Sequence, residues 1–147
     1  MYRIRKLKRE DIPECHDIQQ TSHFHPQNVL WSIEYWYTLQ NLLTDSWVVI
    51  DDNDKVVGYA IGMIRYEEKL ENELAWYWLD ICVRRKVIGC ADDIVSFLVE
   101  NYPVTYAYIN VKNRAVGLLA KRHGFKTVDT IENYYPDGSS SYLVATI

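Results

Sequence analysis

The stretch KVIGCA, Lys86–Ala91, decides the fold because it joins a run typical of a strand to a run typical of a helix. Before it, the apolar run WYWLDICV over Trp76–Val83 favours a buried strand, and after it DDIVSFLVEN over Asp92–Asn101 has helical spacing. A helix that begins directly after a strand presents unpaired amides and the positive end of its dipole. Small residues at that point let an anion approach the backbone, and Lys86 adds a full charge. The stretch therefore has the parts needed to hold a diphosphate, and an ordinary solvated turn is the alternative.

The size and composition indicate one globular domain. The chain has 147 residues, of which 48% are apolar and 14% aromatic. A chain of this length buries roughly two-thirds of its unfolded surface without a metal or a disulfide. Disorder is excluded by the apolar content, and the twelve tyrosines and five tryptophans are enough to line a core or a cleft. We therefore expect a single domain over residues 1–147.

The net charge and the cysteines restrict the partners and the compartment. A formal net charge of −4 disfavours nucleic acid as a partner and suits a cationic substrate. The three cysteines, Cys15, Cys82 and Cys90, form no Cys-x-x-Cys pair or His/Cys ladder, which predicts a reduced protein without a metal site. No apolar run approaches the ~20 residues of a membrane span, and MYRIRKLKRED lacks the apolar core of a signal peptide. We expect a cytoplasmic protein without a membrane partner.

The remaining elements follow from hydrophobic periodicity and turn residues. Strands are expected at Tyr2–Lys8, Ser46–Ile50, Val56–Tyr66, Leu74–Val83, Val104–Val111, Lys126–Tyr135 and Ser141–Ile147. Helices are expected at Glu10–Thr21, Asn28–Leu43, Asp92–Asn101 and Arg114–His123. Asp51–Lys55 and Pro136–Gly138 have the composition of hairpin turns. The order of these elements predicts an α/β (α+β) protein with a mixed sheet and helices on its faces.

The helix at Arg114–His123 has clear signals at both ends. Asn113 can cap its first amides, and Lys121 and the residues after it place positive charge at its negative end. Gly124 and Phe125 supply a left-handed stop followed by an apolar contact.

Two motifs in this part of the chain resemble a known family. KVIGCA fits the frame Gln/Arg-x-x-Gly-x-Gly/Ala, with Lys86 in the first place, and Asn113 is followed six, eleven and twelve residues on by Leu, Gly and Phe. In both respects the sequence resembles the GNAT superfamily of acetyl-CoA-dependent N-acyltransferases. The ending NYYPDGSSSYLVATI, Asn133–Ile147, resembles the ribosomal-protein and other N-terminal protein acetyltransferases. The resemblance implies the GNAT fold, a mixed and mostly antiparallel sheet of six to seven strands with helices on both faces and splayed central parallel strands.

The same resemblance implies acetyl-CoA as the cosubstrate. The backbone of the strand before KVIGCA would bind the pantetheine arm, and the amides of the turn would bind the pyrophosphate. The implied coenzyme-binding residues are Ile81, Cys82, Val83, Lys86, Val87, Ile88, Gly89, Cys90, Ala91 and Asn113. Asp92 and Asp93 compete for the same positive helix end. Gly117 costs about 1 kcal/mol against Ala in a helix, so we hypothesise that the coenzyme or a neighbouring backbone lies close to it.

The catalytic groups depart from the family pattern. The position of the family's acid, a Tyr, holds Ala120, and the position of a common base holds Tyr108. Either Tyr108 or a neighbouring Tyr acts as the acid, with His25 or a water chain as the base, or the protein has lost fast catalysis and only binds. Proximity and orientation can supply much of the rate for a thioester and an α-amine, which favours the first reading. Cys90 at a helix start could have a lowered pKa, but it has no identifiable His or Asp partner.

The acceptor is expected to be the N-terminus of a protein or peptide. An α-amine has a pKa near 7.7–8.0 against about 10.4 for lysine, so it is more easily made neutral. By resemblance, Gln27 belongs to a substrate loop, and Tyr134 and Tyr135 flank the acceptor. As alternating residues of a strand these two tyrosines would point to opposite faces, and packing of a hairpin is their alternative role. A small amine such as a polyamine or an amino sugar is the second possible acceptor, a non-catalytic acyl-CoA-binding protein is the third reading, and a homodimer stays open.

Overall fold

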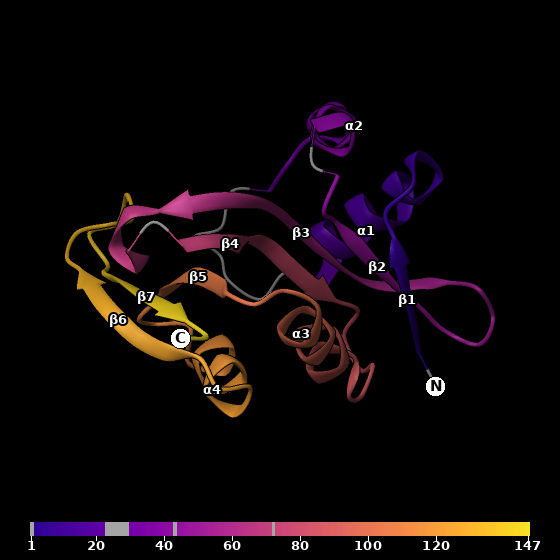
Figure 1. The fold of residues 1–147 in the computed structure, drawn as a ribbon. Helices are drawn as coiled ribbons and strands as arrows, with labels where there is room; N and C mark the ends of the chain where they lie inside the picture. The colour runs from indigo at the N-terminus through magenta and orange to yellow at the C-terminus, as the bar shows by residue number, and fades with distance from the viewer. Residues whose placement is uncertain (1, 23–29, 43, 72) are drawn as a thin grey trace. The chain divides into compact units, whose positions relative to one another are not determined.

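A computed structural model describes residues 2–22, 30–42, 44–71 and 73–147 (Figure 1). The elements in chain order are β1 (Arg3–Lys6), η1 (Arg9–Asp11), α1 (Ile12–Ser22), α2 (Ile33–Leu42), β2 (Trp47–Ile50), β3 (Val56–Glu67), η2 (Glu68–Leu70), β4 (Glu73–Val83), α3 (Cys90–Asn101), β5 (Thr105–Asn110), α4 (Arg114–Arg122), β6 (Lys126–Ile131) and β7 (Ser141–Ala145). Each predicted strand and helix is present, with ends that differ by at most five residues. Within the described residues, no helix is long and apolar enough to cross a membrane.

The strands form one mixed sheet in the order β1-β2-β3-β4-β5-β7-β6. β1 pairs with β2, β2 with β3, β5 with β7 and β6 with β7, each time antiparallel. β4 and β5 are parallel, and their register joins Trp76–Trp78 to Thr105–Ala107. This short parallel pairing inside an otherwise antiparallel sheet confirms the predicted fold class.

The described residues form two compact units, and β3, β4 and α3 contribute to both. The first unit comprises Met1–Met63 and Leu79–Ile94. Its core lies where α1 and α2 cover β2, β3 and the end of β4. The buried members are Ile12, Cys15, Ile18, Trp36, Leu39, Val48, Ile50, Val56, Tyr59, Ile61 and Cys82. The predicted helical spacing of α1 therefore marks its buried face.

Gly58 allows three elements of the first unit to approach one another. A Cβ atom at Gly58 would lie 2.9 Å from Val83 Cγ1 on β4, and 3.2 Å from both the carbonyl oxygen of Cys82 and the Sγ of Cys90 on α3. Tyr59 and Ile61, one and three residues along β3, face the core under α1 and α2. Since side chains alternate along a strand, Gly58 faces the other side, where α3 begins. Helices thus cover both faces of the sheet in this unit.

The second unit comprises Ile64–Trp78 and Val95–Ile147. Its core contains Leu70, Ala75, Tyr106, Leu143 and Ala145. β7 lies between β5 and β6, with Tyr106 opposite Ala145 and Asn110 opposite Ser141.

The ends of α4 confirm the signals in its sequence. The backbone amide of Val116 donates to Asn113 Oδ1 at 3.3 Å, which caps the helix. At the other end, the amide of Phe125 donates to the carbonyl of Ala120, and the amide of Gly124 donates to the carbonyl of Lys121. Gly124 has φ +85°, so this is the left-handed stop that a glycine favours.

Two predicted elements are shorter than expected by four residues or more. α2 begins at Ile33 because Ser32 Oγ accepts the amide of Tyr35 at 3.2 Å and acts as the cap. The strand predicted over Lys126–Tyr135 ends at Ile131. Beyond it Asn133 has φ +55°, so the prediction that Tyr134 and Tyr135 alternate along a strand was wrong.

Candidate active site

The KVIGCA turn lies in the first unit, between the end of β4 and the start of α3. The amide of Arg84 donates to the carbonyl of Val57 at 2.8 Å, and the chain then turns through Lys86 at φ +69° and Gly89 at φ +81°. The amide of Asp93 donates to the carbonyl of Gly89 at 3.0 Å and opens the helix. The amides of Cys90 and Ala91 therefore precede the first intrahelical bond and have no intrahelical acceptor.

The three cations before this turn have different roles. Arg84 Nη1 donates to Asp17 Oδ2 at 3.0 Å, and its Nε donates to the carbonyl of Val56 at 3.2 Å, so this side chain ties the end of β4 to α1 and β3. Arg85 and Lys86 are exposed. Of the three consecutive positive residues, the first therefore has a structural role, and the other two remain at the surface of the turn.

The turn fits a diphosphate. A Cβ atom built at Gly89 would have no atom within 4 Å, and Ile88 is 89% exposed, so the main chain is open to a ligand on this side. Main-chain amides at a helix start and a lysine are the donors that phosphate oxygens take up in proteins. Asp92 and Asp93 in the first turn of α3 oppose this charge, as the sequence predicted.

The cysteines beside the turn are packed residues. Cys82 and Cys90 are both buried, and burial raises the pKa of each thiol to about 12. The lowered pKa predicted for Cys90 was wrong, because desolvation of the thiolate, with Asp93 nearby, outweighs the helix start. No cluster of three or more His, Cys, Asp or Glu side chains that could hold a metal occurs among the described residues.

A second polar group lies in the second unit, around Glu67 at the end of β3. The Tyr108 hydroxyl donates to Glu67 Oε2 at 3.2 Å, and the amide of Lys69 donates to Glu67 Oε1 at 3.3 Å. Arg65 Nη2 lies 3.7 Å from Glu67 Oε2. Glu67 is only 8% exposed. Its carboxylate is held in place by these three positive or donating groups.

The tyrosine hydroxyls around Glu67 keep their protons. The pKa of Tyr108 is raised by burial and by the charge of Glu67, and its hydrogen bond to that carboxylate raises it further. Burial also raises the pKa of Tyr106 to about 12, although the charge of Arg65 opposes the shift. The Tyr108 hydroxyl therefore stays protonated at physiological pH, hydrogen-bonded to the Glu67 carboxylate.

The predicted substrate tyrosines lie against Tyr108. Tyr134 stacks on Tyr108 with a centroid distance of 5.3 Å and an interplanar angle of 7°. Tyr135 meets Tyr134 edge-on at 4.9 Å. Tyr134 is 45% exposed, and Tyr135 is half-buried. The loop after β6 thus brings both tyrosines to one place, which the assumed strand would not have done.

Sequence reasoning missed Glu67 and a second carboxylate, Asp80. Glu67 and Glu68 together have the composition of a polar loop. An acid at the end of a long apolar strand is nevertheless a signal that could have indicated a functional carboxylate. His25 and Gln27 lie outside the described residues. Asn113 is in place as the cap of α4.

Asp80 lies at the centre of a buried network in the first unit. The Tyr59 hydroxyl donates to Asp80 Oδ2 at 2.6 Å, and Gln19 Nε2 donates to the same atom at 3.0 Å. Gln19 Oε1 in turn accepts the indole N–H of Trp36 at 3.1 Å and the amide of Trp31 at 2.9 Å. The network fixes the chain at Trp31, two residues before α2.

Comparisons with known proteins identify the fold. The structure is similar to the ribosomal-protein-S18-alanine N-acetyltransferase from Escherichia coli (TM-score 0.72, 19% identity, covering 99% of this chain and 92% of that one). It is also similar to NAA60 from Arabidopsis thaliana in complex with acetyl-CoA (0.77, 18%, 99% and 97%). A third similar structure is a spermidine N-acetyltransferase SpeG chimera from Vibrio cholerae and hSSAT (0.78, 16%, 99% and 95%). No protein-family model and no curated protein matched the sequence.

These similarities extend over almost the whole chain. All three identities lie below 20%, so what they establish is the architecture. The chain has the fold of the GNAT acetyltransferases, and the predicted resemblance is confirmed at this level.

Proposed function

We propose that the protein is an acetyl-CoA-dependent N-acyltransferase that transfers the acetyl group directly to a primary amine. The observation that carries the proposal is the KVIGCA turn, where open main-chain amides, Gly89 at φ +81° and the exposed Lys86 meet at the start of α3. The similar Arabidopsis structure, whose ligand is acetyl-CoA, supports the same coenzyme.

The coenzyme supplies the acetyl group as an activated thioester. The amides of Ile88 to Ala91 and the Lys86 ammonium would hold its diphosphate. The amide of Val87, also expected there, donates to the carbonyl of Arg84 at 3.4 Å. The backbone of Ile81 to Val83 would hydrogen-bond the pantetheine arm, with Asn113 at the start of α4. Holding both reactants in one geometry is the main contribution such a site makes to the rate.

Proton transfer is assigned to the second unit. The attacking amine must be neutral, so a proton has to be accepted, and the departing thiolate has to receive one. Tyr108 carries a proton at its hydroxyl, and Glu67 accepts a hydrogen bond from it. We assign Tyr108 as the donor of a proton to the departing thiolate, with Glu67 holding its hydroxyl in place and solvent water returning the proton afterwards. His25 or a water chain would be the base that accepts the proton of the amine.

The acceptor we favour is the N-terminal α-amine of a protein or peptide. Tyr134 is exposed beside Tyr108, and with Tyr135 it would contact the backbone of the acceptor, with Gln27 in the loop before α2. Small amines form the second candidate class, since one similar structure acts on spermidine and the net charge of −4 suits a cation. We place the reaction in the cytoplasm because the three cysteines are free thiols.

Calorimetric titration with acetyl-CoA tests the coenzyme site. We expect saturable binding that Lys86→Glu weakens at least tenfold, because it sets a negative charge against the diphosphate. Arg85→Glu, the same change at the neighbouring exposed cation, is the control and should have a smaller effect. Equal affinity in Lys86→Glu and the parent would show that the anion binds elsewhere.

Release of free thiol from acetyl-CoA tests the transfer and its acceptor. Turnover with N-terminal peptides and none with spermidine supports the favoured acceptor, and the reverse supports the small amine. Saturable binding of acetyl-CoA without turnover on any amine would contradict the enzymatic assignment and leave an acyl-CoA-binding protein.

A further inference from the structure

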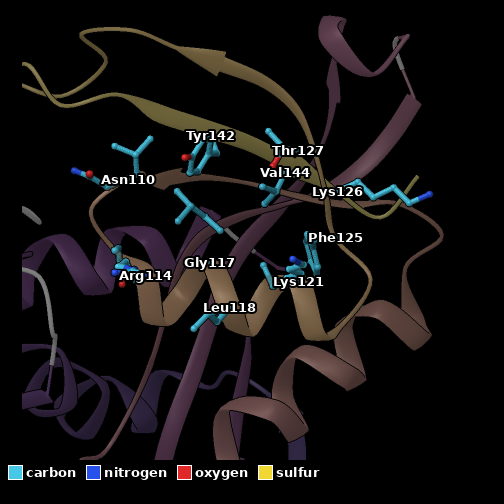
Figure 2. A pocket seen from close by; sticks show the side chains of 14 residues that line it. Asn110, Arg114, Gly117, Leu118, Lys121, Phe125, Lys126, Thr127, Tyr142 and Val144 are labelled. Atoms are coloured by element: carbon cyan, nitrogen blue, oxygen red, sulfur yellow. The ribbon is translucent and has the colours of Figure 1, made fainter.

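A groove of about 590 Å³ lies within the second unit, between α4 and the strands β5, β7 and β6 (Figure 2). Its size is in the range of small-molecule sites, which is roughly 300–1,000 Å³. Gly117 of α4 lines the groove, and a Cβ atom at this position would meet nothing within 4 Å. Among the described residues, no neighbouring backbone lies close to Gly117, contrary to one of the two hypotheses for this glycine.

The walls of the groove are mostly apolar. Ile109 contributes from β5. Tyr142 and Val144 contribute from β7, and Phe125 contributes from the residue just before β6 (Figure 2). Tyr142 is 38% exposed and Leu118 is 59% exposed, so two large side chains on opposite sides of the groove are left open to solvent. A ligand with an aliphatic or aromatic body would gain about 25 cal/mol for each Å² of apolar surface that it removes from water here.

The charged residues of the groove are all positive. Arg114 lies near one end, and Lys121 and Lys126 lie at the other (Figure 2). No Asp or Glu is among the fourteen lining residues, although the whole chain carries −4. Within the described part of the chain, none of these three cations has an ion-pair partner. The groove is thus a local positive field over an apolar floor.

We propose that this groove binds an amphipathic carboxylate, a small molecule with an aliphatic or aromatic body and one anionic end. The apolar body would lie over Gly117 against Val144 and Tyr142, and the carboxylate would pair with Lys121 and Lys126. Charge-assisted hydrogen bonds of this kind are about twice as strong as neutral ones. Asn113, which the proposed function assigns to the coenzyme, also lines the groove. The proposal goes beyond the proposed transfer reaction because its ligand is a carboxylate other than the coenzyme.

Binding of octanoate to the full chain, followed by NMR chemical shifts and calorimetry, tests the proposal. We expect saturable binding of octanoate, with shifts at Gly117 and Val144, and much weaker binding of octanol and of inorganic phosphate. Addition of saturating acetyl-CoA should leave octanoate bound. Displacement of octanoate by acetyl-CoA would instead make the groove part of the coenzyme site and overturn the proposal.

Three variants locate the site. Gly117→Leu should abolish octanoate binding by filling the groove, and the double variant Lys121→Glu/Lys126→Glu should lower affinity at least tenfold. Lys55→Glu, a matched charge change in the exposed turn between β2 and β3, should leave octanoate affinity within twofold.

The octanoate-binding results can be told apart from those of the transfer assay. Unchanged octanoate affinity in the folded double variant would overturn the assignment of the carboxylate, even if Gly117→Leu failed to fold. Equal binding of octanol and octanoate would show a plain apolar groove and also overturn it. Thiol release by the parent protein, measured in parallel, reports on the transferase separately.

Discussion

At the scale of single residues, the site depends on how each polar atom is used by its neighbours. Arg84 and Lys86 are two residues apart, yet the first is engaged by Asp17 and a main-chain carbonyl and the second is open. Glu67 is nearly buried, but it accepts hydrogen bonds from Tyr108 and from a backbone amide and pairs with Arg65, so its charge is stabilised by three neighbours. Ala120 carries no hydroxyl, and under the proposed function Tyr108 is the proton donor instead.

Substitution of the Glu67–Tyr108 pair tests this assignment. Tyr108→Phe removes the donated proton and Glu67→Gln removes the carboxylate, so each should lower kcat by about 10²-fold, the lower end for general acid-base catalysis. The affinity for acetyl-CoA, measured by calorimetry, should stay within twofold of the parent. The pH profile adds a second readout. Because the pKa of Tyr108 is raised, kcat of the parent should not fall between pH 8 and 10 through loss of its proton. Full activity of Tyr108→Phe would remove it as the donor.

At the scale of elements, glycines decide where backbones meet and where they leave space. Gly58 lies at the contact of β3, β4 and α3, where a Cβ atom would clash with a β-branched side chain and a main-chain carbonyl. Gly117 lies at the opposite extreme, in the middle of α4 beside open space. The same residue type therefore has opposite consequences in two elements.

A pair of Gly→Ala variants tests this contrast. Gly58→Ala should destabilise the protein by about 1–3 kcal/mol, since neither Val83 nor the Cys82 carbonyl can move freely. Gly117→Ala should stabilise it by about 1 kcal/mol, because alanine is the better helix former and its methyl meets no neighbour. Urea unfolding followed by circular dichroism measures both. Two changes of the same sign would contradict the packing described for one of the glycines.

At the scale of the whole molecule, several buried groups must keep their protons for the chain to stay folded. Burial raises the pKa of Cys82 and Cys90 from 9.0 to about 12 and that of Tyr106 from 10.0 to about 12. A raised pKa in the folded state means that the unfolded chain loses its proton first as pH increases. The stability from these groups is therefore complete below pH 9 and is lost progressively towards pH 12.

The expected result is a steady loss of stability on the alkaline side. The urea midpoint should fall between pH 8 and pH 11, and it should fall less steeply in Cys82→Ala/Cys90→Ala, where two of the titrating groups are gone. Unfolding monitored by tryptophan fluorescence at constant ionic strength measures the slope. A midpoint independent of pH over this range would refute the burial of these groups.

Local patterns were enough to predict the order of elements, the mixed sheet and the turn before α3. Periods of two and 3.6 residues, the cap at Asn113 and the glycine stops report on backbone geometry that a few neighbouring residues determine. For the same reason the ends of α4 were predicted to within one residue. The KVIGCA turn belongs to this group, since its glycine, its lysine and the helix start are adjacent in the chain.

Only the tertiary structure decided which distant side chains meet. Glu67 and Tyr108 are 41 residues apart, and the loop after β6 places Tyr134 on Tyr108, contacts that no local pattern encodes. The raised pKa of Cys90 likewise follows from burial against β3, which outweighs the helix dipole that the sequence suggested. Long-range packing sets desolvation and proximity, and these two quantities, unlike secondary structure, depend on what the rest of the chain brings to the same place.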